Sequence, residues 1–388
     1  MVSVNELFGG TVMSAVPDPY AVYRRLRRES PVTLVDMVFS EVYLVTRYDD
    51  VLAILKNAAR FSARAHAKGI GLVFGKTIIE MDGRAHVRHR NLIAPAFAPR
   101  ALAGVLPAVM REIAHQLIDG LEPQGRADLV SQFTFTFPLR VMCGILGLPV
   151  ADYEAFHRLA LDLISIADDP PRAFAAAQAI ADYLRPLLAQ RRAEPTGDLV
   201  SSLVHAEVDG ERLSEEEVLS FLRLLIPAGA ETTYRLLGSA LLALLMHPRL
   251  LEEVRADRTK VGWAIEETLR WEAPVQHIPR ETTEPVTIAG VDIPAGSMVM
   301  GAVGSANRDE SHFPDPDRFD LHRRPDDHLA FGFGRHFCAG ANFARAEAAV
   351  ALNALLDRLP RLRVEPGTES GVVGLAFRSP ERLPVRFD

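Results

Sequence analysis

One segment constrains the fold more than any other, because it predicts a single long helix that must be buried. Ser214 and Glu217 have the spacing of a capping box, in which each residue bonds the backbone of the other at a helix start. Apolar residues then recur with helical spacing as far as Met246. Three charged residues interrupt the stretch and argue against a membrane span: Arg223, Glu231 and Arg235. A helix about 50 Å long is expected, around which the rest of the chain must pack.

The other segments predict a mainly α protein with a small β-sheet region. Further helical patterns occupy residues 19–28, 85–190, 260–271 and 340–359. Strand-like patterns occupy residues 32–34, 42–45, 286–288 and 298–303. With no internal repeat, we expect one domain over residues 1–388, with a β-containing N-terminal part of about 1–85 and a helical remainder.

Composition excludes several classes of protein. A net charge of −7 and a pI near 6.0 argue against nucleic acid as a partner, because phosphate binding needs a surplus of Lys and Arg. The 388 residues contain only two cysteines, Cys143 and Cys338, so we do not expect a disulfide framework. We expect a reducing, cytoplasmic location instead. The first ten residues lack the basic flank and apolar run of a signal peptide. No membrane association is expected.

Cys338 lies in a glycine-rich loop, Phe331-Gly-Phe-Gly-Arg-His-Phe-Cys-Ala-Gly340, just before a predicted helix. The positive end of that helix would stabilise a thiolate, and the glycines would admit a flat, bulky ligand. A soft anionic sulfur at such a position suits iron. The alternative is a buried, unreactive cysteine, which is our interpretation of Cys143 in its apolar surroundings.

The loop resembles the signature of the cytochrome P-450 family, Phe-Gly-x-Gly-x-His-x-Cys-x-Gly, at every fixed position. This resemblance implies the family's fold, with haem b between the long central helix and the helix after the cysteine. Cys338 would be the iron ligand, and the haem would contact Phe331, Gly332, Gly334 and Gly340. A zinc site is a weaker alternative, because Cys338 lacks a Cys-x-x-Cys companion and His86 with His89 supplies too few ligands.

The middle of the long helix carries Pro227-Ala-Gly-Ala-Glu-Thr-Thr233, where a proline and a glycine predict a bend. The polar residues of this motif would alternatively lie on a solvated face, although apolar flanks favour burial. The motif resembles the family's oxygen-activation sequence. By that resemblance Thr232 would hydrogen-bond the dioxygen being activated, Glu231 would relay protons, and Ala228 and Gly229 would contact haem.

Two further sets of residues match positions that the family uses. The resemblance assigns the haem propionates to His86, Arg90, Arg280 and His336, although an isolated Arg90 or Arg280 is more often a solvated surface residue. It assigns a buried structural network to Glu267, Arg270 and Arg318. The spacing of Glu267 and Arg270 alone would indicate only an ordinary helix ion pair.

The family's substrate-contact segments are mostly apolar in this sequence. The residues expected to line a hydrophobic pocket are Phe74, Ile78, Ile79, Ile226, Val275, Gln276, His277, Ile278 and Leu375, with Leu72 and Val73 beside them. Gln276 and His277 would be polar anchors. Placement in the core is an equally good interpretation of the set, and the sequence does not choose among terpenoid, fatty acid, polyketide and aromatic substrates.

The chain has no dinucleotide-binding glycine motif and no cysteine cluster for iron–sulfur. The resemblance therefore implies a monooxygenase of secondary metabolism that inserts one oxygen atom of O2, usually by hydroxylation. Its electrons would come from a ferredoxin or flavodoxin with an NAD(P)H-dependent reductase, docking near Arg88, Arg335 and Arg345. The alternatives are a peroxide-driven peroxygenase and a non-catalytic haem protein that binds a ligand.

Overall fold

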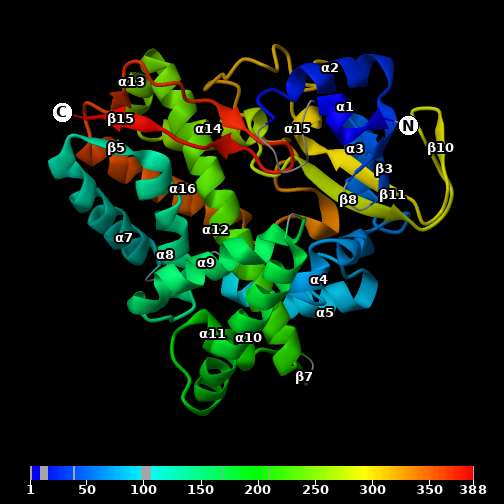
Figure 1. The fold of residues 1–388 in the computed structure, drawn as a ribbon, viewed down its shortest axis with the longest axis horizontal. Helices are drawn as coiled ribbons and strands as arrows, with labels where there is room; N and C mark the ends of the chain where they lie inside the picture. Colours follow the sequence, from blue (N-terminus) through cyan, green and yellow to red (C-terminus); the bar gives the residue numbers. More distant parts are fainter. Residues whose placement is uncertain are drawn as a thin grey trace.

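A helical part and a smaller sheet part lie side by side in the computed structural model (Figure 1). The structure describes residues 2–8, 16–37, 40–97, 106–167, 169–208 and 210–387. The prediction of a mainly helical protein with a small sheet region is confirmed. None of the helices in these ranges is both long and apolar enough to cross a membrane.

The long central helix is α12 (Glu215–Met246), which begins where the capping box predicts. The Ser214 hydroxyl accepts from the Glu217 N–H at 3.2 Å, and the Glu217 carboxylate accepts from the Ser214 N–H at 2.7 Å. The helix is unbroken through Pro227, so the predicted bend within it stays a prediction. Most of its side chains are buried because helices surround it, and Figure 1 shows it running through the middle of the molecule.

The neighbouring helices form the helical part. Those that pack directly on α12 include α8 (Thr136–Ile145), α9 (Tyr153–Ile164), α10 (Pro170–Ala193), α14 (Lys260–Trp271) and α16 (Ala341–Arg358). The remaining longer helices are α2 (Tyr20–Glu29), α3 (Tyr48–Lys56), α5 (Gly83–Ile93), α7 (Leu106–Leu121) and α13 (Pro248–Ala256). The short helices are α1 (Val4–Phe8), α4 (Gly71–Phe74), α11 (Leu199–Val204) and α15 (Val303–Ala306).

The main sheet joins the two ends of the sequence, with the strand order β1-β2-β3-β11-β8-β4. Its strands are β1 (Val2–Ser3), β2 (Val32–Asp36), β3 (Glu41–Val45), β11 (Met298–Ala302), β8 (His277–Thr282) and β4 (Phe61–Ser62). Strand β11 runs parallel to β3 and antiparallel to β8, so Val299 stands between Tyr43 and Arg280. The predicted strands near 32–34, 42–45 and 298–303 are confirmed, whereas β8 was not predicted because Pro279 and charged residues interrupt its pattern.

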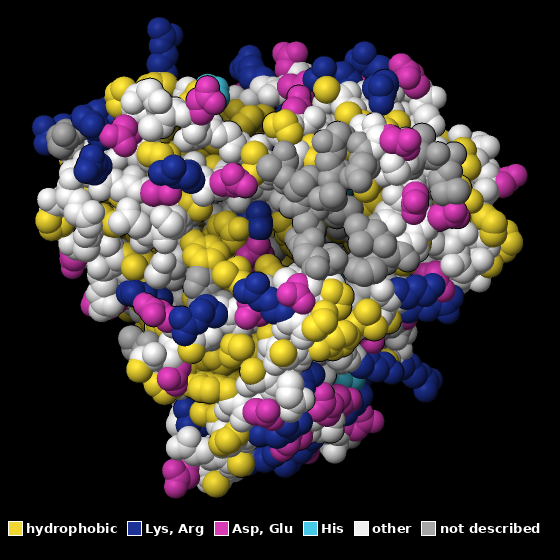
Figure 2. All heavy atoms as spheres, viewed as in Figure 1, with side chains coloured by type: hydrophobic (Ala, Val, Ile, Leu, Met, Phe, Trp, Pro, Cys, Tyr) yellow, Lys and Arg dark blue, Asp and Glu magenta, His cyan; other side chains and the backbone are white. Residues whose placement is uncertain are grey.

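The described residues also form four small antiparallel sheets. In one of them β15 (Pro384–Arg386) lies between β12 (Arg363–Val364) and β5 (Arg126–Asp128). The other three pair β9 (Val286–Ile288) with β10 (Val291–Ile293), β13 (Val372–Val373) with β14 (Ser379–Pro380), and β6 (Glu207–Val208) with β7 (Glu211–Arg212). The largest apolar core surrounds α12, and two smaller cores lie against the main sheet. Figure 2 shows apolar side chains gathered over the centre of one face, with charged side chains spread around them.

Candidate active site

The cysteine loop, residues 331–340, folds back so that Cys338 stands just before α16. The Cys338 N–H donates to the Phe331 carbonyl at 2.9 Å, which closes the loop. Gly332 and Gly334 have φ values of +68° and +70°, in the left-handed region that favours glycine. Two of the three glycines predicted to shape this loop, Gly332 and Gly334, are therefore required by its backbone conformation, whereas Gly340 has a φ of −89° that any residue can adopt.

The surroundings of the Cys338 sulfur suit a metal-bound thiolate. Burial raises the pKa of the thiol, while the backbone N–H of Gly340 and the charges of Arg90 and Arg345 lower it. The side chain nevertheless stays accessible, so the sulfur is recessed but open to a ligand. The N-terminal end of α16 adds positive potential. A bound metal ion would complete the stabilisation of the anionic sulfur.

Histidine and arginine side chains from four separate segments gather near this loop. The rings of His86 and His336 lie 4.3 Å apart between centroids, and Asp82 lies 3.6 Å from His336. Burial, together with the charge of Arg280, lowers the pKa of His336 to about 4 and that of His66 to about 3. Burial and repulsion from neighbouring positive groups therefore keep the imidazoles of His66 and His336 uncharged at neutral pH.

Arg280 lacks an acidic partner in the described part of the chain. Its side chain is 3% exposed, and its guanidinium donates to the carbonyl of Pro279 at 2.8 Å. Burial lowers its pKa to about 10, and the distant carboxylate of Asp82 opposes this only in part. A buried guanidinium of this kind calls for an anion. Carboxylates of a haem would fit here, with His86 and Arg90 beside them.

Helix α12 presents an opening in its otherwise buried middle. Ala228 is exposed and Thr232 is half-buried, although their neighbours Ile226 and Thr233 are buried. The Thr232 hydroxyl donates to the Ala228 carbonyl at 2.8 Å, as a threonine inside a helix commonly does. Gly229 faces elsewhere, because a side chain at this position would collide with Met142 of α8. The opening therefore belongs to Ala228 and Thr232, while Gly229 allows close packing of α8.

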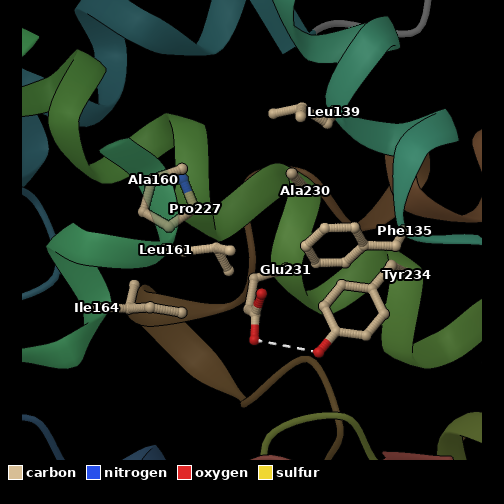
Figure 3. Close-up of a pocket in the computed structure, with 9 residues that line it drawn as sticks. All are labelled: Phe135, Leu139, Ala160, Leu161, Ile164, Pro227, Ala230, Glu231 and Tyr234. Atoms are coloured by element: carbon tan, nitrogen blue, oxygen red, sulfur yellow. Dashed lines mark hydrogen bonds between the residues drawn. The ribbon is translucent and has the colours of Figure 1, made fainter. Parts of the chain in front are cut away.

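Glu231 lies on a different side of α12, next to a small cavity (Figure 3). The residues lining the cavity are Phe135, Leu139, Ala160, Leu161, Ile164, Pro227, Ala230, Glu231 and Tyr234. Arg235 donates to the Glu231 carboxylate at 3.0 Å, and the Tyr234 hydroxyl donates to it at 3.5 Å. The Glu231 carboxylate is thus paired, and its burial confirms what the apolar flanks of the motif predicted, although Thr232 is only half-buried.

Comparison with known proteins identifies the family. A family model for cytochrome P450 matches residues 159–370. The cytochrome P450 monooxygenase PikC of Streptomyces venezuelae is 39% identical over 382 residues, covering 95% of this chain and 91% of that protein. The mycinamicin IV hydroxylase/epoxidase of Micromonospora griseorubida is 38% identical, covering 94% of both. The structure of the bacillaene polyketide synthase P450 PksS from Bacillus subtilis 168 superposes with a TM-score of 0.89 at 34% identity, covering 96% of this chain and 97% of that one.

The chain belongs to the cytochrome P450 family. Its relatives are bacterial monooxygenases, hydroxylases and epoxidases, so this P450 is an oxygen-incorporating, haem-dependent oxidoreductase of the haem-thiolate class. The residues present fit that cofactor, since an accessible thiol, Cys338, and a buried guanidinium, Arg280, that has no acidic partner within the described ranges belong to the same site. No group of three or more His, Cys, Asp or Glu side chains within the described ranges is placed to hold a metal ion, so the zinc alternative gains no support.

The prediction that Arg318 belongs to the buried structural network is wrong. Glu267 and Arg270 form a buried bidentate pair, with N–O distances of 2.8 and 2.7 Å. The Arg318 side chain, however, is 66% exposed and pairs with Asp320 at the surface. Arg323 takes the predicted place, 3.3 Å from Glu267. Arg318 contributes only its backbone carbonyl, which accepts from Arg270.

The two predicted polar anchors for substrate are structural in this P450. Gln276 is fully buried and donates to the Ala273 carbonyl at 2.8 Å. His277 lies 2.9 Å from the Tyr23 hydroxyl, and burial lowers the pKa of its imidazole to about 4. Alternation along the start of β8 turns His277 toward α2 and not toward the cysteine loop. Both side chains contact tyrosines of α2, since Gln276 donates to the Tyr20 hydroxyl at 3.4 Å and His277 lies against Tyr23, so neither is free to hold a substrate.

The predicted apolar contacts divide into two groups. Phe74, Ile78, Ile226 and Leu375 are buried in apolar cores, which matches the alternative interpretation of these residues. Three others are half-buried: Ile79, Val275 and Ile278. A side chain at Gly332 would come 3.5 Å from Ile278, so Ile278 contacts the cysteine loop.

Three residues of the site were not predicted. His66 comes from a 3₁₀ turn (Ala63–Lys68) without a recognisable motif, and Arg323 lies in a proline-rich segment without periodicity. Glu347 of α16 is fully buried. Among the described residues, no donor lies within hydrogen-bonding distance and geometry of either of its carboxylate oxygens. Burial raises the pKa of Glu347 well above its usual range, with Thr233 of α12 opposing the rise. The only sequence signal for Glu347 was a charged residue on the buried face of a helix.

Proposed function

We propose that this P450 inserts one oxygen atom of O2 into an apolar polyketide-type molecule, most simply by hydroxylation. The observation that carries the proposal is the similarity, over more than nine-tenths of both chains, to a polyketide biosynthesis P450 and to a mycinamicin hydroxylase/epoxidase. The half-buried side chains of Ile79 and Val275 supply apolar surface for such a substrate. A cytoplasmic location accompanies the proposal, because a supply of NAD(P)H is needed.

The proposed cofactor is haem b, with Cys338 as iron ligand and with His86, Arg90, Arg280 and His336 around the propionates. Phe331, Gly332, Gly334 and Gly340 would follow the face of the porphyrin on the cysteine side. Haem iron supplies dioxygen activation when bound, and a thiolate promotes it by donating electron density. The protein contributes positive charge to the rim and a dipole to the sulfur.

The test combines binding and turnover. Candidate polyketides, steroids and fatty acids would be screened for a change in the haem absorption spectrum, and those that bind would be incubated with NAD(P)H, a ferredoxin and its reductase under isotopically labelled dioxygen. A product carrying one labelled atom is expected. Products formed from peroxide alone would indicate a peroxygenase, and unchanged compounds throughout would indicate a non-catalytic haem protein.

Thr232 and Glu231 are proposed to deliver protons during the reaction. A Thr232→Ala variant should still consume NAD(P)H but release peroxide, with product per NAD(P)H falling by roughly 10²-fold, the lower end of what a positioned proton donor contributes. Thr232→Ser keeps the hydroxyl and should keep the coupling. Measurement of NAD(P)H, peroxide and product in the same reaction checks this, and unchanged coupling in Thr232→Ala would contradict the role.

The docking site for the electron carrier is proposed to centre on Arg335. Two of the three arginines expected there are already paired within the chain: Arg88 with Glu211 and Glu217, and Arg345 with Glu266. Arg335 is exposed in the cysteine loop, beside the exposed ring of Phe333. Lys56 lies 5.2 Å from the centre of that ring. An acidic ferredoxin or flavodoxin would meet both an apolar contact and positive charge.

Arg335→Glu should therefore slow reduction of the haem by an acidic ferredoxin about tenfold at low ionic strength, and much less at high salt. Stopped-flow spectroscopy over a range of salt concentrations measures the rate. Arg382→Glu is the charge-reversal control, because Arg382 is 75% exposed outside the cysteine loop and lies 3.6 Å from Asp128. Equal rates in the two variants at low salt would place the docking site elsewhere.

A further inference from the structure

Arg235 occupies a central position in a small polar network next to Glu231. It lies one helical turn after Glu231 on α12, and its Nε donates to the Glu231 carboxylate at 3.0 Å, with a second, closer contact from Nη2. Its Nη1 donates to the Ser379 hydroxyl at 3.1 Å. Arg235 thus bridges the carboxylate on α12 and strand β14.

Stacking and burial hold this bridge in one arrangement. The guanidinium lies 4.8 Å from the ring centre of Tyr234 and 5.5 Å from that of Phe377. The Arg235 side chain is 17% exposed and the Glu231 side chain 9%. An ion pair in such surroundings is screened little by water, and its geometry is fixed by the planar guanidinium. Glu231 is consequently held in one orientation beside the cavity in Figure 3.

The far end of the bridge, Ser379, belongs to the C-terminal turn, which is the segment from the end of β13 to the start of β14, residues 374–379. Phe377 in this turn makes a β-bridge with Val275, which belongs to the segment proposed to contact the substrate. Ser379 follows two residues later and is buried. A continuous chain of contacts therefore links this turn through Arg235 to Glu231.

We infer that Arg235 is a positioning residue that orients the Glu231 carboxylate and anchors this orientation to the C-terminal turn at Ser379. The inference rests on the proposed role of Glu231 in proton delivery. The cavity next to Glu231 has a volume of about 20 Å³, enough for one water molecule. Arg235 keeps the carboxylate beside this cavity, while Thr232 faces the opening in the middle of α12.

A double-mutant cycle tests the inference. The variants are Glu231→Gln, Arg235→Gln and the double variant, each assayed as haem-loaded enzyme for the ratio of product to peroxide per NAD(P)H. Arg235→Gln should lower this ratio about tenfold, within the range for contacting residues of one network, and should add little in the Glu231→Gln background. Ser379→Ala should change the ratio in the same direction by a smaller factor, since it removes one hydrogen bond and no charge.

The outcomes separate the inference from the proposed function. If Glu231→Gln leaves the ratio unchanged, the proposed role of Glu231 fails and the inference fails with it. If Glu231→Gln lowers the ratio but Arg235→Gln does not, only the inference is overturned. The same holds if the double variant shows the full product of the two single-variant effects, because the two residues would then act independently. The carbon monoxide spectrum reports folding of each variant. Should Arg235→Gln fail to fold, Arg235→Lys replaces it, because lysine keeps the charge beside Glu231 but cannot also reach Ser379. A wild-type ratio of product to peroxide in Arg235→Lys would overturn the inference.

Discussion

A Cys338→Ala variant is expected to lose both oxygen insertion and the red-shifted Soret band of the reduced, carbon monoxide-bound protein. The accessible thiol of Cys338 beside α16 is the proposed iron ligand. Alanine has no sulfur and cannot donate electron density to the iron as a thiolate does. Loss of an outer partner of a metal ligand commonly costs roughly 10- to 100-fold in activity, so loss of the ligand itself should exceed about 100-fold. Absorption spectra and product formation would be measured on the same preparation.

Cys143→Ala is the matched control. Cys143 is fully buried in α8, and burial raises the pKa of its thiol to about 12, so it remains a neutral apolar side chain. The control should keep the Soret band and the activity, with a loss of unfolding free energy of about 1 kcal/mol from the small cavity. A folded Cys338→Ala protein that keeps the red-shifted band would show that another group holds the iron.

The features that the sequence predicted well are those fixed by residues close together in the chain. The capping box, which spans only Ser214 to Glu217, sets the start of α12. Gly332 and Gly334 of the cysteine loop stand at positions that need a positive φ. The thiol, the loop and the following helix form one continuous segment. Local backbone chemistry is enough to place such a unit, whatever packs around it.

The features that were missed depend on long-range packing. His66 joins His336 and Arg280 only because β4 and β8 pair in the sheet, and the register of that pairing cannot be read from either strand alone. Likewise, Gln276 and His277 contact Tyr20 and Tyr23 of α2, which lie 256 and 254 positions away in the chain. Alternation predicts that neighbouring side chains point to opposite faces, but not which face meets the ligand.

The exchange of Arg318 for Arg323 has a local cause. Both residues lie in a proline-rich segment in which Asp315 and Arg324 adopt positive φ values of 46° and 49°. Such turns redirect the chain within a few residues, so the side chain that reaches inward is not set by helical or strand periodicity. The family motif identified the correct segment, and the turn geometry decides which arginine of that segment approaches Glu267.

The buried pair of Glu267 and Arg270 yields the largest expected loss of stability. Both side chains are fully buried, and Arg270 also donates to the carbonyls of Asn307 and Pro316 at 2.9 Å, which ties α14 to the segment before the cysteine loop. Glu267→Gln keeps the shape but leaves the guanidinium charge uncompensated away from water. Breaking a buried pair in this way costs about 3–5 kcal/mol, and urea unfolding of the haem-loaded protein would measure it.

Arg318→Ala distinguishes the observed network from the one that the motif implied. Because the Arg318 side chain is mostly exposed and pairs with Asp320 at the surface, its removal should change the unfolding free energy by no more than about 0.5 kcal/mol. Arg323→Ala should cost more, since that side chain is 13% exposed and lies against the buried Glu267 carboxylate. The reverse order, with Arg318→Ala the more damaging, would mean that Arg318 and not Arg323 completes the network, and that the turn near Asp315 directs the chain differently.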